Sequence, residues 1–338
     1  MSNRDAWLDL TSEDAIDPDL PICDPHHHLW DYPGSHYLVD GFLADLGGGH
    51  HVVKTVFVEC GQFYSKTDER IFRPVGETIR VDQMASALPA GSNTQVAAGI
   101  VGFADLTLGD AVRPVLEAHL DASTRFRGIR HASAWDADEK IHNAHTRPPQ
   151  FLLGSSDFRN GLAQLTDLGL SFDAWLYHLQ IPELTDLAQA NPGLSIILNH
   201  MAGPLGIGPY RGQGDDVFQQ WKKHMEMLSQ CENVSVKLGG RAMTMSGFGW
   251  HKLDRPPGSR QLAAAMAPYF NSCIDLFGPR RCMFESNFPM DRASCSYTVL
   301  WNAFKRVSRG FSDTERAALF HNTAARVYRL TRSLSDLT

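Results

Sequence analysis

Two histidines near the start of the chain have the spacing of a pair that acts together. They are His26 and His28, in the segment ICDPHHHLWD of residues 22–31. If this segment is a strand, its two-residue period points both imidazoles to one side, where they can bind one metal ion or one substrate oxygen. His27 would then face the other way. An H-x-H pair also occurs in histidine-rich turns, so the rest of the chain must decide.

Eight short apolar runs recur along the chain and alternate with longer segments that suit helices. The runs cover residues 21–28, 52–59, 96–103, 126–131, 170–177, 194–200, 233–238 and 281–287. Strands that alternate with helices in this way predict a single-domain α/β protein with the (β/α)8 fold, a TIM barrel. An open doubly wound sheet is the alternative, but no G-x-G-x-x-G turn follows any of the runs.

The segments between the runs carry helical patterns. We expect helices over residues 75–88, 110–121, 182–190, 217–231 and 262–277. A last helix follows Ser312, which stands three residues before Glu315 as in a capping box. Residues 40–51, with three consecutive glycines, are predicted to form a loop.

Two connections are longer than a plain barrel needs. Residues 132–156 follow the fourth strand and residues 239–261 follow the seventh. Loops after barrel strands lie on the carboxyl face, where the active sites of this fold form. We therefore expect both loops to cover the substrate. His251, in the second loop, is either a substrate-binding residue or an ordinary surface histidine.

Polar side chains stand at or near the ends of most predicted strands. They are His26, His28, Glu59, Arg127, Arg130, Tyr177, His178, His200, Lys237, Glu285 and Asn287. Because the strand ends of a barrel meet at one mouth, we expect one site that contains imidazoles, carboxylates and cations. Neutral imidazole binds Zn²⁺ well, and a bound metal lowers the pKa of water or polarises a carbonyl group.

Several members of this set have two interpretations. Arg127 and Arg130 are expected to share a face of their strand and to bind the anionic end of a substrate, although pairing with carboxylates elsewhere is the commoner fate of an arginine. Lys237 has the same ambiguity. Tyr177 and His178 point to opposite sides of their strand, so at most one of them lines the mouth.

The composition limits the classes of function. A hydrophobic share of 43% with 20% charged residues is that of a globular protein with a large core. The net charge of -7, without a block of lysines and arginines, argues against nucleic-acid or membrane partners, while a small anionic substrate stays open. No run approaches the roughly 20 apolar residues of a membrane helix and no signal peptide is evident, so we expect a cytoplasmic location.

The cysteines and the chain ends fit one barrel in a reducing compartment. The six cysteines are scattered without C-x-x-C spacing and are expected to be reduced and mostly buried. Residues 1–19 are acidic and are expected to form an arm that wraps an edge of the barrel or a partner subunit in a homo-oligomer. The barrel itself is placed at residues 20–332, and a short tail at residues 333–338.

Four motifs together resemble the amidohydrolase superfamily. DPHHHLWD, FRGIRH, LNHMAGP and RCMFESNFPMD resemble, in order and spacing over nearly the whole chain, the amidohydrolase-related branch that contains 2-pyrone-4,6-dicarboxylate lactonase and sugar lactonases. The resemblance implies a barrel that hydrolyses a lactone, either with a divalent metal, zinc being the expected ion, or without one. His26, His28 and His200 match the family's metal-binding or carbonyl-polarising histidines. Arg127 and Arg130 fall where pyrone lactonases hold a substrate carboxylate.

The last strand departs from the family pattern. The family commonly has GSDWP, whose aspartate activates the attacking water, but here the five residues from Glu285 are ESNFP, with Asn287 in place of the aspartate. An amide cannot act as a carboxylate base. Three interpretations follow. Glu285 or Glu59 has taken over the proton transfer, or a bound metal activates the water and Asn287 only orients it, or hydrolysis has been lost.

The sequence therefore predicts a hydrolase that opens a lactone or a related bond of a small, carboxylated substrate by attack of water. The alternatives are a non-oxidative decarboxylase or hydratase of a carboxylic acid, and a ligand-binding relative without catalysis. The candidate catalytic residues are His26, His28, His200, Asn287, Glu59 and Glu285. The candidate substrate-binding residues are Arg127, Arg130, Tyr177, Lys237 and His251, and the candidate metal ligands are His26, His28 and His200.

Overall fold

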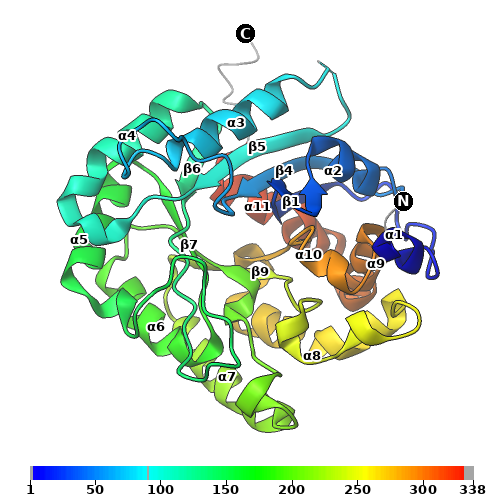
Figure 1. The fold of residues 1–338 in the computed structure, drawn as a ribbon. Helices are drawn as coiled ribbons and strands as arrows, with labels where there is room; N and C mark the ends of the chain where they lie inside the picture. The colour runs from blue at the N-terminus through cyan, green and yellow to red at the C-terminus, as the bar shows by residue number, and fades with distance from the viewer. Residues whose placement is uncertain (1–2, 90, 331–338) are drawn as a thin grey trace.

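Eight parallel strands form the centre of the molecule. The computed structural model describes residues 3–89 and 91–330. The strands are β1 (Ile22–His27), β4 (Val52–Val58), β5 (Gln95–Gly102), β6 (Phe126–Ile129), β7 (Ser171–Ala174), β8 (Ile196–Leu198), β9 (Val234–Leu238) and β10 (Cys282–Phe284), hydrogen-bonded in this order. The His28 backbone N–H donates to the carbonyl of Phe288 (2.8 Å), so the segment after β10 adjoins β1. The predicted (β/α)8 barrel is confirmed, and it is nearly closed (Figure 1).

Helices form an outer ring around this barrel (Figure 1). They are α2 (Val39–Leu46), α3 (Val75–Ser86), α4 (Arg113–Ala122), α5 (Ser156–Asp167), α6 (Ile181–Ala190), α7 (Gly214–Leu228), α8 (Ser259–Phe277) and α9 (Tyr297–Val307). The chain continues through α10 (Asp313–Ala317), a π-helical turn (Ala318–Asn322) and α11 (Thr323–Val327). A hairpin of β2 (Trp30–Tyr32) and β3 (Ser35–Tyr37) follows β1.

Two helix starts show how well local patterns predict the fold. The capping box at Ser312 is confirmed, because its hydroxyl accepts from the N–H of Glu315 while the Glu315 carboxylate accepts from the N–H of Ser312. The prediction of a loop over residues 40–51 is wrong in its first part, which forms α2. Phe42 and Leu46 stand four residues apart and bury one face of that helix, and the glycines come only after its end.

The C-terminal segment fills the barrel interior at its amino-terminal end. Tyr328 is fully buried and packs in one cluster with Cys23 of β1 and Val56 of β4. At the start of β4, the ammonium group of Lys54 donates to the carbonyl of Leu330 (2.7 Å). The larger hydrophobic core lies between the strands and the helices. The carboxyl ends of the strands are therefore the open end of the barrel, where sites of this fold form.

The N-terminal arm packs against its own chain. It begins with α1 (Asn3–Leu8), and the indole N–H of Trp7 donates to the carbonyl of Leu253 in the loop after β9 (2.8 Å). Further along the arm, the backbone N–H of Ile16 donates to the side chain of Asn302 on α9 (2.7 Å). The arm thus links the loop after β9 to the outer ring of helices.

The cysteines, the C-terminus and the hydropathy of the helices complete the description. All six cysteines are free thiols, and five of them are buried, as expected. The predicted tail at residues 333–338 lies outside the described residues. Within the described ranges, no helix combines the length and the apolar character that a bilayer crossing requires.

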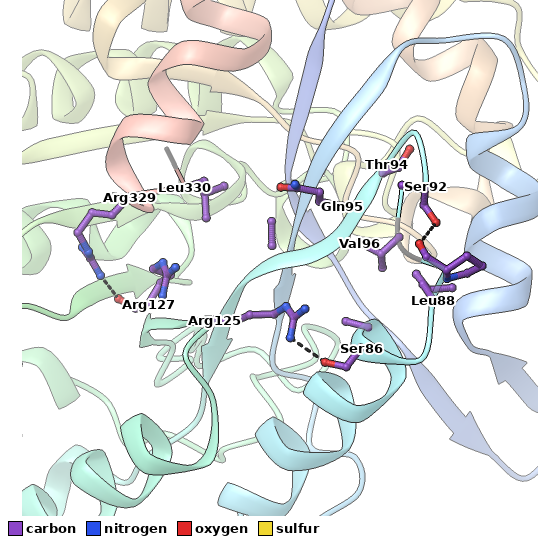
Figure 2. Close-up of a pocket in the computed structure, with 14 residues that line it drawn as sticks. Ser86, Leu88, Ser92, Thr94, Gln95, Val96, Arg125, Arg127, Arg329 and Leu330 are labelled. Carbon is purple, nitrogen blue, oxygen red and sulfur yellow. Dashed lines mark hydrogen bonds between the residues drawn. The ribbon is translucent and has the colours of Figure 1, made fainter. Parts of the chain in front are cut away.

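Arg127 lies at the opposite end of the barrel from Arg130, which corrects the prediction that both arginines bind one substrate. Arg127 lines a cavity of about 570 Å³ together with Arg125 and Arg329, next to the end of the C-terminal segment (Figure 2). Its guanidinium donates to two neighbouring backbone carbonyls (2.8 Å each). The two arginines are three residues apart, so the two-residue period of a strand points them to opposite faces.

Candidate active site

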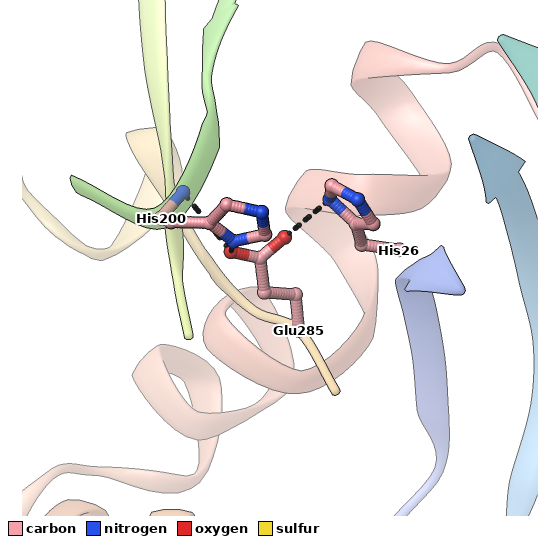
Figure 3. Close-up of side chains that lie close together, drawn as sticks. All are labelled: His26, His200 and Glu285. Carbon is pink, nitrogen blue, oxygen red and sulfur yellow. Dashed lines mark hydrogen bonds and ion pairs between the residues drawn. The ribbon is translucent and has the colours of Figure 1, made fainter. Parts of the chain in front are cut away.

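A buried carboxylate joins two imidazoles at the carboxyl end of the barrel. Glu285, just after β10, lies between His26 of β1 and His200, which follows β8 (Figure 3). Its Oε1 is 2.6 Å from Nδ1 of His200 and also accepts from the His200 backbone N–H (3.1 Å). Its Oε2 is 2.7 Å from Nδ1 of His26. Three distant parts of the chain therefore meet in one buried cluster.

Special backbone conformations hold His200 in this cluster. His200, Met201 and Ala202 have φ angles of 53°, 52° and 61°. Such angles cost a non-glycine residue roughly 1–3 kcal/mol each and are common at functional sites. The turn is secured by Trp221, whose indole N–H donates to the Met201 carbonyl (2.8 Å). On the other side Gly240 leaves room for the imidazole, since a Cβ atom there would lie 2.6 Å from Cγ of His200.

Burial shifts the pKa values of all three groups. Desolvation raises the pKa of Glu285 to about 8, although the charge of Lys237 opposes the change. Desolvation, and after it the charge of Lys237, lowers the pKa of His26 well below its usual value. Desolvation and the charge of Arg130 do the same to the pKa of His200. Both imidazoles are therefore neutral, which is the form that binds a metal.

The cluster has the donor set of a metal site. The ligand atoms of His26, His200 and Glu285 all lie within 4.8 Å of one another. Oε2 of Glu285 contacts His26 without the alignment of a hydrogen bond, so within the described residues this buried oxygen has no hydrogen-bond partner. A divalent cation would supply that partner, and two imidazoles with one carboxylate suit zinc. The residues therefore fit a metal, with Glu285 in the place for which His28 was predicted.

His28 lies beside the cluster and lines the cavity above it. The centres of the His28 and His26 rings are 4.9 Å apart, and Nδ1 of His28 is 2.7 Å from the carbonyl oxygen of Val58. Burial, and after it the charge of Arg130, lowers the pKa of His28 to about 3. A neutral imidazole donates to a carbonyl from one nitrogen only, so Nε2 of His28 is left as an acceptor.

A second buried carboxylate orients an imidazole on a loop. Glu59, just after β4, pairs with Nε of Arg130 (2.7 Å) and with Nε2 of His145 (3.1 Å). Burial alone would raise the pKa of Glu59, but the charges of Arg130 and His145 hold that pKa well below its usual range. The His145 side chain is 45% exposed and lines the cavity. With Nε2 on Glu59, Nδ1 is the ring nitrogen of His145 that this pair leaves available.

Asn287 has a carboxylate neighbour in Asp291. The Asn287 side-chain N–H donates to Oδ2 of Asp291 (2.5 Å), and Oδ1 of Asp291 accepts from the backbone N–H of Ala242 (2.7 Å). Desolvation raises the pKa of Asp291 to about 8. Oδ1 of Asn287 is buried and has no hydrogen-bond partner in the part of the chain that is described. Asn287 lines the cavity, and this oxygen is the acceptor of its amide that the described part of the protein leaves unpaired.

Some of these groups, namely His28, Arg130, His145, His200 and Asn287, line one cavity of about 610 Å³. We call its four polar strand-end residues the floor: His28, Arg130, His200 and Asn287. Both loops that were predicted to cover the substrate also line the cavity. Residues 132–156 contribute His142, Ala144 and His145, and residues 239–261 contribute Met243, Thr244 and Met245. The cavity thus combines a polar floor with walls from two long connections.

The other predicted site residues lie in three different places. Tyr177 lines the cavity. Lys237 is fully buried, with Nζ 2.8 Å from Oδ1 of Asp173 and 3.3 Å from Nδ1 of His26. His251 lies in a short turn after β9 and does not line the cavity. Lys237 and His251 therefore do not line the cavity, and Lys237 instead contacts His26.

Two residues of the site were not singled out from the sequence. His145 lies in the long loop of residues 132–156, and the only signal for it was its place in that loop. Asp291 follows Asn287 by four residues in the motif FESNFPMD, and the signal there was a carboxylate within one turn of the substituted position. Neither signal is specific, because loops and turns commonly carry such residues.

Comparisons with known proteins identify relatives of the whole chain. A protein-family model described as Amidohydrolase matches residues 23–330. The uncharacterised protein y4mH of Sinorhizobium fredii is 33% identical, over 92% of this chain and 99% of its own length. L-fucono-1,5-lactonase of Burkholderia multivorans is 23% identical, over 91% of this chain and 95% of its own length. A crystal structure of an amidohydrolase from B. multivorans with bound zinc has a TM-score of 0.71 at 22% identity, covering 92% of this chain and 99% of that one.

Proposed function

The chain belongs to the amidohydrolase family, and from that premise we propose that it hydrolyses a lactone in the cavity at the carboxyl end of the barrel. The observation that carries the proposal is the buried cluster of His26, His200 and Glu285 next to this cavity. The similarity to L-fucono-1,5-lactonase over 91% of the chain adds support for a lactone as the substrate. We further propose that the cluster holds a zinc ion, which would act as a Lewis acid on the lactone carbonyl.

The side chains around the cavity have complementary roles in the attack of water. Oδ1 of Asn287 accepts a hydrogen bond from the water and orients it. His145, oriented by Glu59, takes a proton from the water at Nδ1 while the water oxygen bonds to the carbonyl carbon. The bond from that carbon to the ring oxygen then breaks, and the proton passes from His145 to the ring oxygen. The product is a hydroxy acid, which is ionised at neutral pH.

This assignment changes the predicted roles of the two glutamates. Glu285 stays inside the buried cluster, where both of its oxygens contact imidazoles. Glu59 is bound by Arg130 and acts on the substrate only through His145. A residue that orients an imidazole in this way selects which ring nitrogen exchanges the proton.

Two measurements on the purified full-length chain test the proposal. Base consumption at constant pH is expected with at least one member of a panel of five- and six-membered lactones, and no turnover across the panel would contradict the proposal. Protein purified without chelator is expected to carry about one equivalent of zinc, since sites of this kind bind stoichiometrically. Full activity with less than about a tenth of an equivalent would contradict the metal role while leaving hydrolysis in place.

Non-oxidative decarboxylation is the second candidate, and Asn287 is the observation that favours it. Decarboxylation does not activate a water molecule, so an amide in place of a carboxylate at this position would cost that reaction nothing. Release of labelled CO2 from aromatic carboxylic acids, without base consumption by lactones, is the outcome that would support this candidate over hydrolysis.

A further inference from the structure

The walls of the cavity are mostly apolar. Four aromatic side chains line it, namely Trp30, Tyr32, Trp175 and Tyr177. Three methionines add to these walls: Met243 and Met245 come from the loop after β9, and Met290 from the segment after β10. The polar members of the walls are Ser35, His142, His145 and Thr244. Methionine and aromatic side chains present mainly sulfur and ring carbon to a ligand, which offer little hydrogen bonding.

The polar atoms of three of these aromatic residues are already occupied by the protein. The indole N–H of Trp30 donates to the hydroxyl of Ser35 (3.0 Å). The hydroxyl of Tyr32 donates to the carbonyl of Cys60 (2.9 Å), and the hydroxyl of Tyr177 donates to the backbone carbonyl of His142. These three side chains therefore offer mainly ring carbon to a ligand. The hydrogen-bonding side chains of the cavity lie on the floor and at Ser35, His142, His145 and Thr244.

Among the described residues, the side chains that line the cavity also offer no unpaired lysine or arginine to an anionic ligand. Within the described residues its lining contains one arginine, Arg130, and no lysine. The guanidinium of Arg130 is paired with the carboxylate of Glu59 and also donates to the Glu59 backbone carbonyl. Arg127, which was expected to hold a substrate carboxylate, lines the cavity at the other end of the barrel.

We infer that the substrate is a neutral lactone with an apolar body, such as an alkyl- or aryl-substituted lactone, rather than a polyhydroxylated sugar lactone or a carboxylated one. The inference rests on the proposed lactone hydrolysis and specifies its substrate class. The lactone group would meet the floor, and the substituent would lie against the aromatic and methionine walls. Each substrate hydroxyl buried there without a partner would lower the catalytic efficiency by roughly 10-fold. A cavity of about 610 Å³ has room for a lactone ring with a substituent.

Three lactones with six-membered rings test this inference on the full chain. δ-Decalactone is the apolar probe, L-fucono-1,5-lactone the hydroxylated one and 2-pyrone-4,6-dicarboxylate the carboxylated one. We expect kcat/KM for δ-decalactone to exceed that for each of the others by at least about 100-fold, because several polar groups would be buried unpaired. Equal or better turnover of either polar lactone would overturn the inference and leave lactone hydrolysis standing.

Binding separates the two proposals if none of the three lactones is hydrolysed. The lactonase proposal then fails, and the substrate class is judged from the rise in the thermal unfolding temperature that each lactone causes, since a ligand of the folded state stabilises it. A rise with δ-decalactone alone supports an apolar ligand. A rise with either polar lactone, or no rise with δ-decalactone, overturns the inference.

A pair of exposed methionines supplies a matched test of the walls. Met290 lines the cavity and is 45% exposed, whereas Met227 on α7 is 51% exposed and lies outside the cavity. We expect Met290→Gln to lower the ratio of kcat/KM for δ-decalactone to that for unsubstituted δ-valerolactone by about 10-fold. Met227→Gln should leave both values unchanged. An unchanged ratio in Met290→Gln would contradict contact between this wall and the substituent.

Discussion

The amide of Asn287 is held from one side, because its nitrogen donates to Asp291 while its oxygen has no partner in the described part of the chain. Asp291 is fully buried and does not line the cavity. We therefore infer that Asp291 orients Asn287 and does not itself contact the substrate. The asparagine is then an organised part of the site and not the remnant of a lost carboxylate.

Exchange of this asparagine for aspartate tests that view. In Asn287→Asp, two carboxyl groups would lie about as close as the present 2.5 Å contact to Asp291, so one of them must hold a proton. We expect kcat at neutral pH to fall by at least about 10-fold, because the substitution removes the N–H group that Asp291 binds and so disturbs the oxygen that orients water. A rise in kcat would instead identify Asn287 as a lost base. The double variant Asn287→Asp with Asp291→Asn restores an amide–carboxylate pair and should recover the unfolding temperature but not kcat.

Removal of the His145 imidazole tests its role as the base. In His145→Gln we expect kcat to drop by about 10²- to 10⁴-fold, because the group that takes the proton from water is lost. His36→Gln, at an exposed histidine paired with Asp31 on the hairpin, is the control and should keep the wild-type kcat. A His145→Gln variant with the wild-type kcat would exclude His145 as the base.

The turn after β8 and the start of the loop after β9 together position the His200 ring. The left-handed turn at His200 needs the space that Gly240 leaves, and Gly240 has itself a φ angle of 68°. The neighbouring Gly239 leaves room for Glu285 in the same way, since a Cβ at Gly239 would lie 2.3 Å from Cγ of Glu285. Two consecutive glycines thus make room for two members of the buried cluster.

Gly240→Ala separates this steric role from simple backbone strain. The new Cβ would lie 2.6–2.7 Å from atoms of the His200 ring, so we expect activity to fall at least about 100-fold and the free energy of unfolding to fall by about 2–4 kcal/mol. Gly212→Ala is the matched control, because its φ is 77° but nothing lies within 4 Å of the added carbon. That variant should lose only about 1 kcal/mol by denaturant titration and keep full activity. Equal losses in both variants would contradict the steric role.

The elements were predictable to different degrees, and the reasons are physical. Buried parallel strands are continuous apolar runs, so all eight were evident, and capping at Ser312 could be read from two residues. The hairpin at Trp30–Tyr32 and Ser35–Tyr37 gave no comparable signal, because its strands are three residues long. α2 was missed since the three glycines that end it dominated the local pattern.

The site was less predictable than the barrel. The strand-end positions of His26, His200 and Glu285 follow from topology, and they meet as topology requires. The pairing of Glu59 with His145 depends on the path of a long loop, which residue types do not determine. The prediction for Arg127 was wrong because side chains alternate between the two faces of a strand. Arg127 and Arg130 are three residues apart, so they cannot share a face.

Buried carboxyl groups make the free energy of unfolding of the chain depend on pH. Glu77 of α3 is buried, and its Oε1 accepts from the backbone N–H groups of Cys60 (3.1 Å) and Gln62 (2.8 Å). Burial and the charge of Glu59 raise the pKa of Glu77. The folded chain therefore keeps a proton that the unfolded chain has lost above about pH 4.3. The contribution of Glu77 to stability is present below that pH and is lost as the pH rises toward the raised pKa.

Glu77→Gln should remove this dependence, because the amide keeps the acceptor oxygen without a titrating group. We expect the variant to gain stability over the wild type as the pH rises from 5 to 8, by up to about 1.4 kcal/mol per pH unit. Thermal unfolding at several pH values measures the difference. The control is Glu117→Gln, in a half-exposed pair with Arg113, whose effect should be small at every pH. A Glu77→Gln effect that is constant with pH would contradict the raised pKa.

The division of the cavity between floor and walls has a consequence for how such a protein can diverge. The floor comes from strand ends that the nearly closed barrel holds in place, whereas much of the wall comes from the loops at residues 132–156 and 239–261. Replacement of loop residues such as Met243 or Met245 would alter ligand preference without disturbing the buried cluster. The residues proposed for catalysis and the residues proposed for substrate choice thus lie in separate segments of the sequence. A few substitutions in the loops could therefore change the substrate while the reaction stays the same.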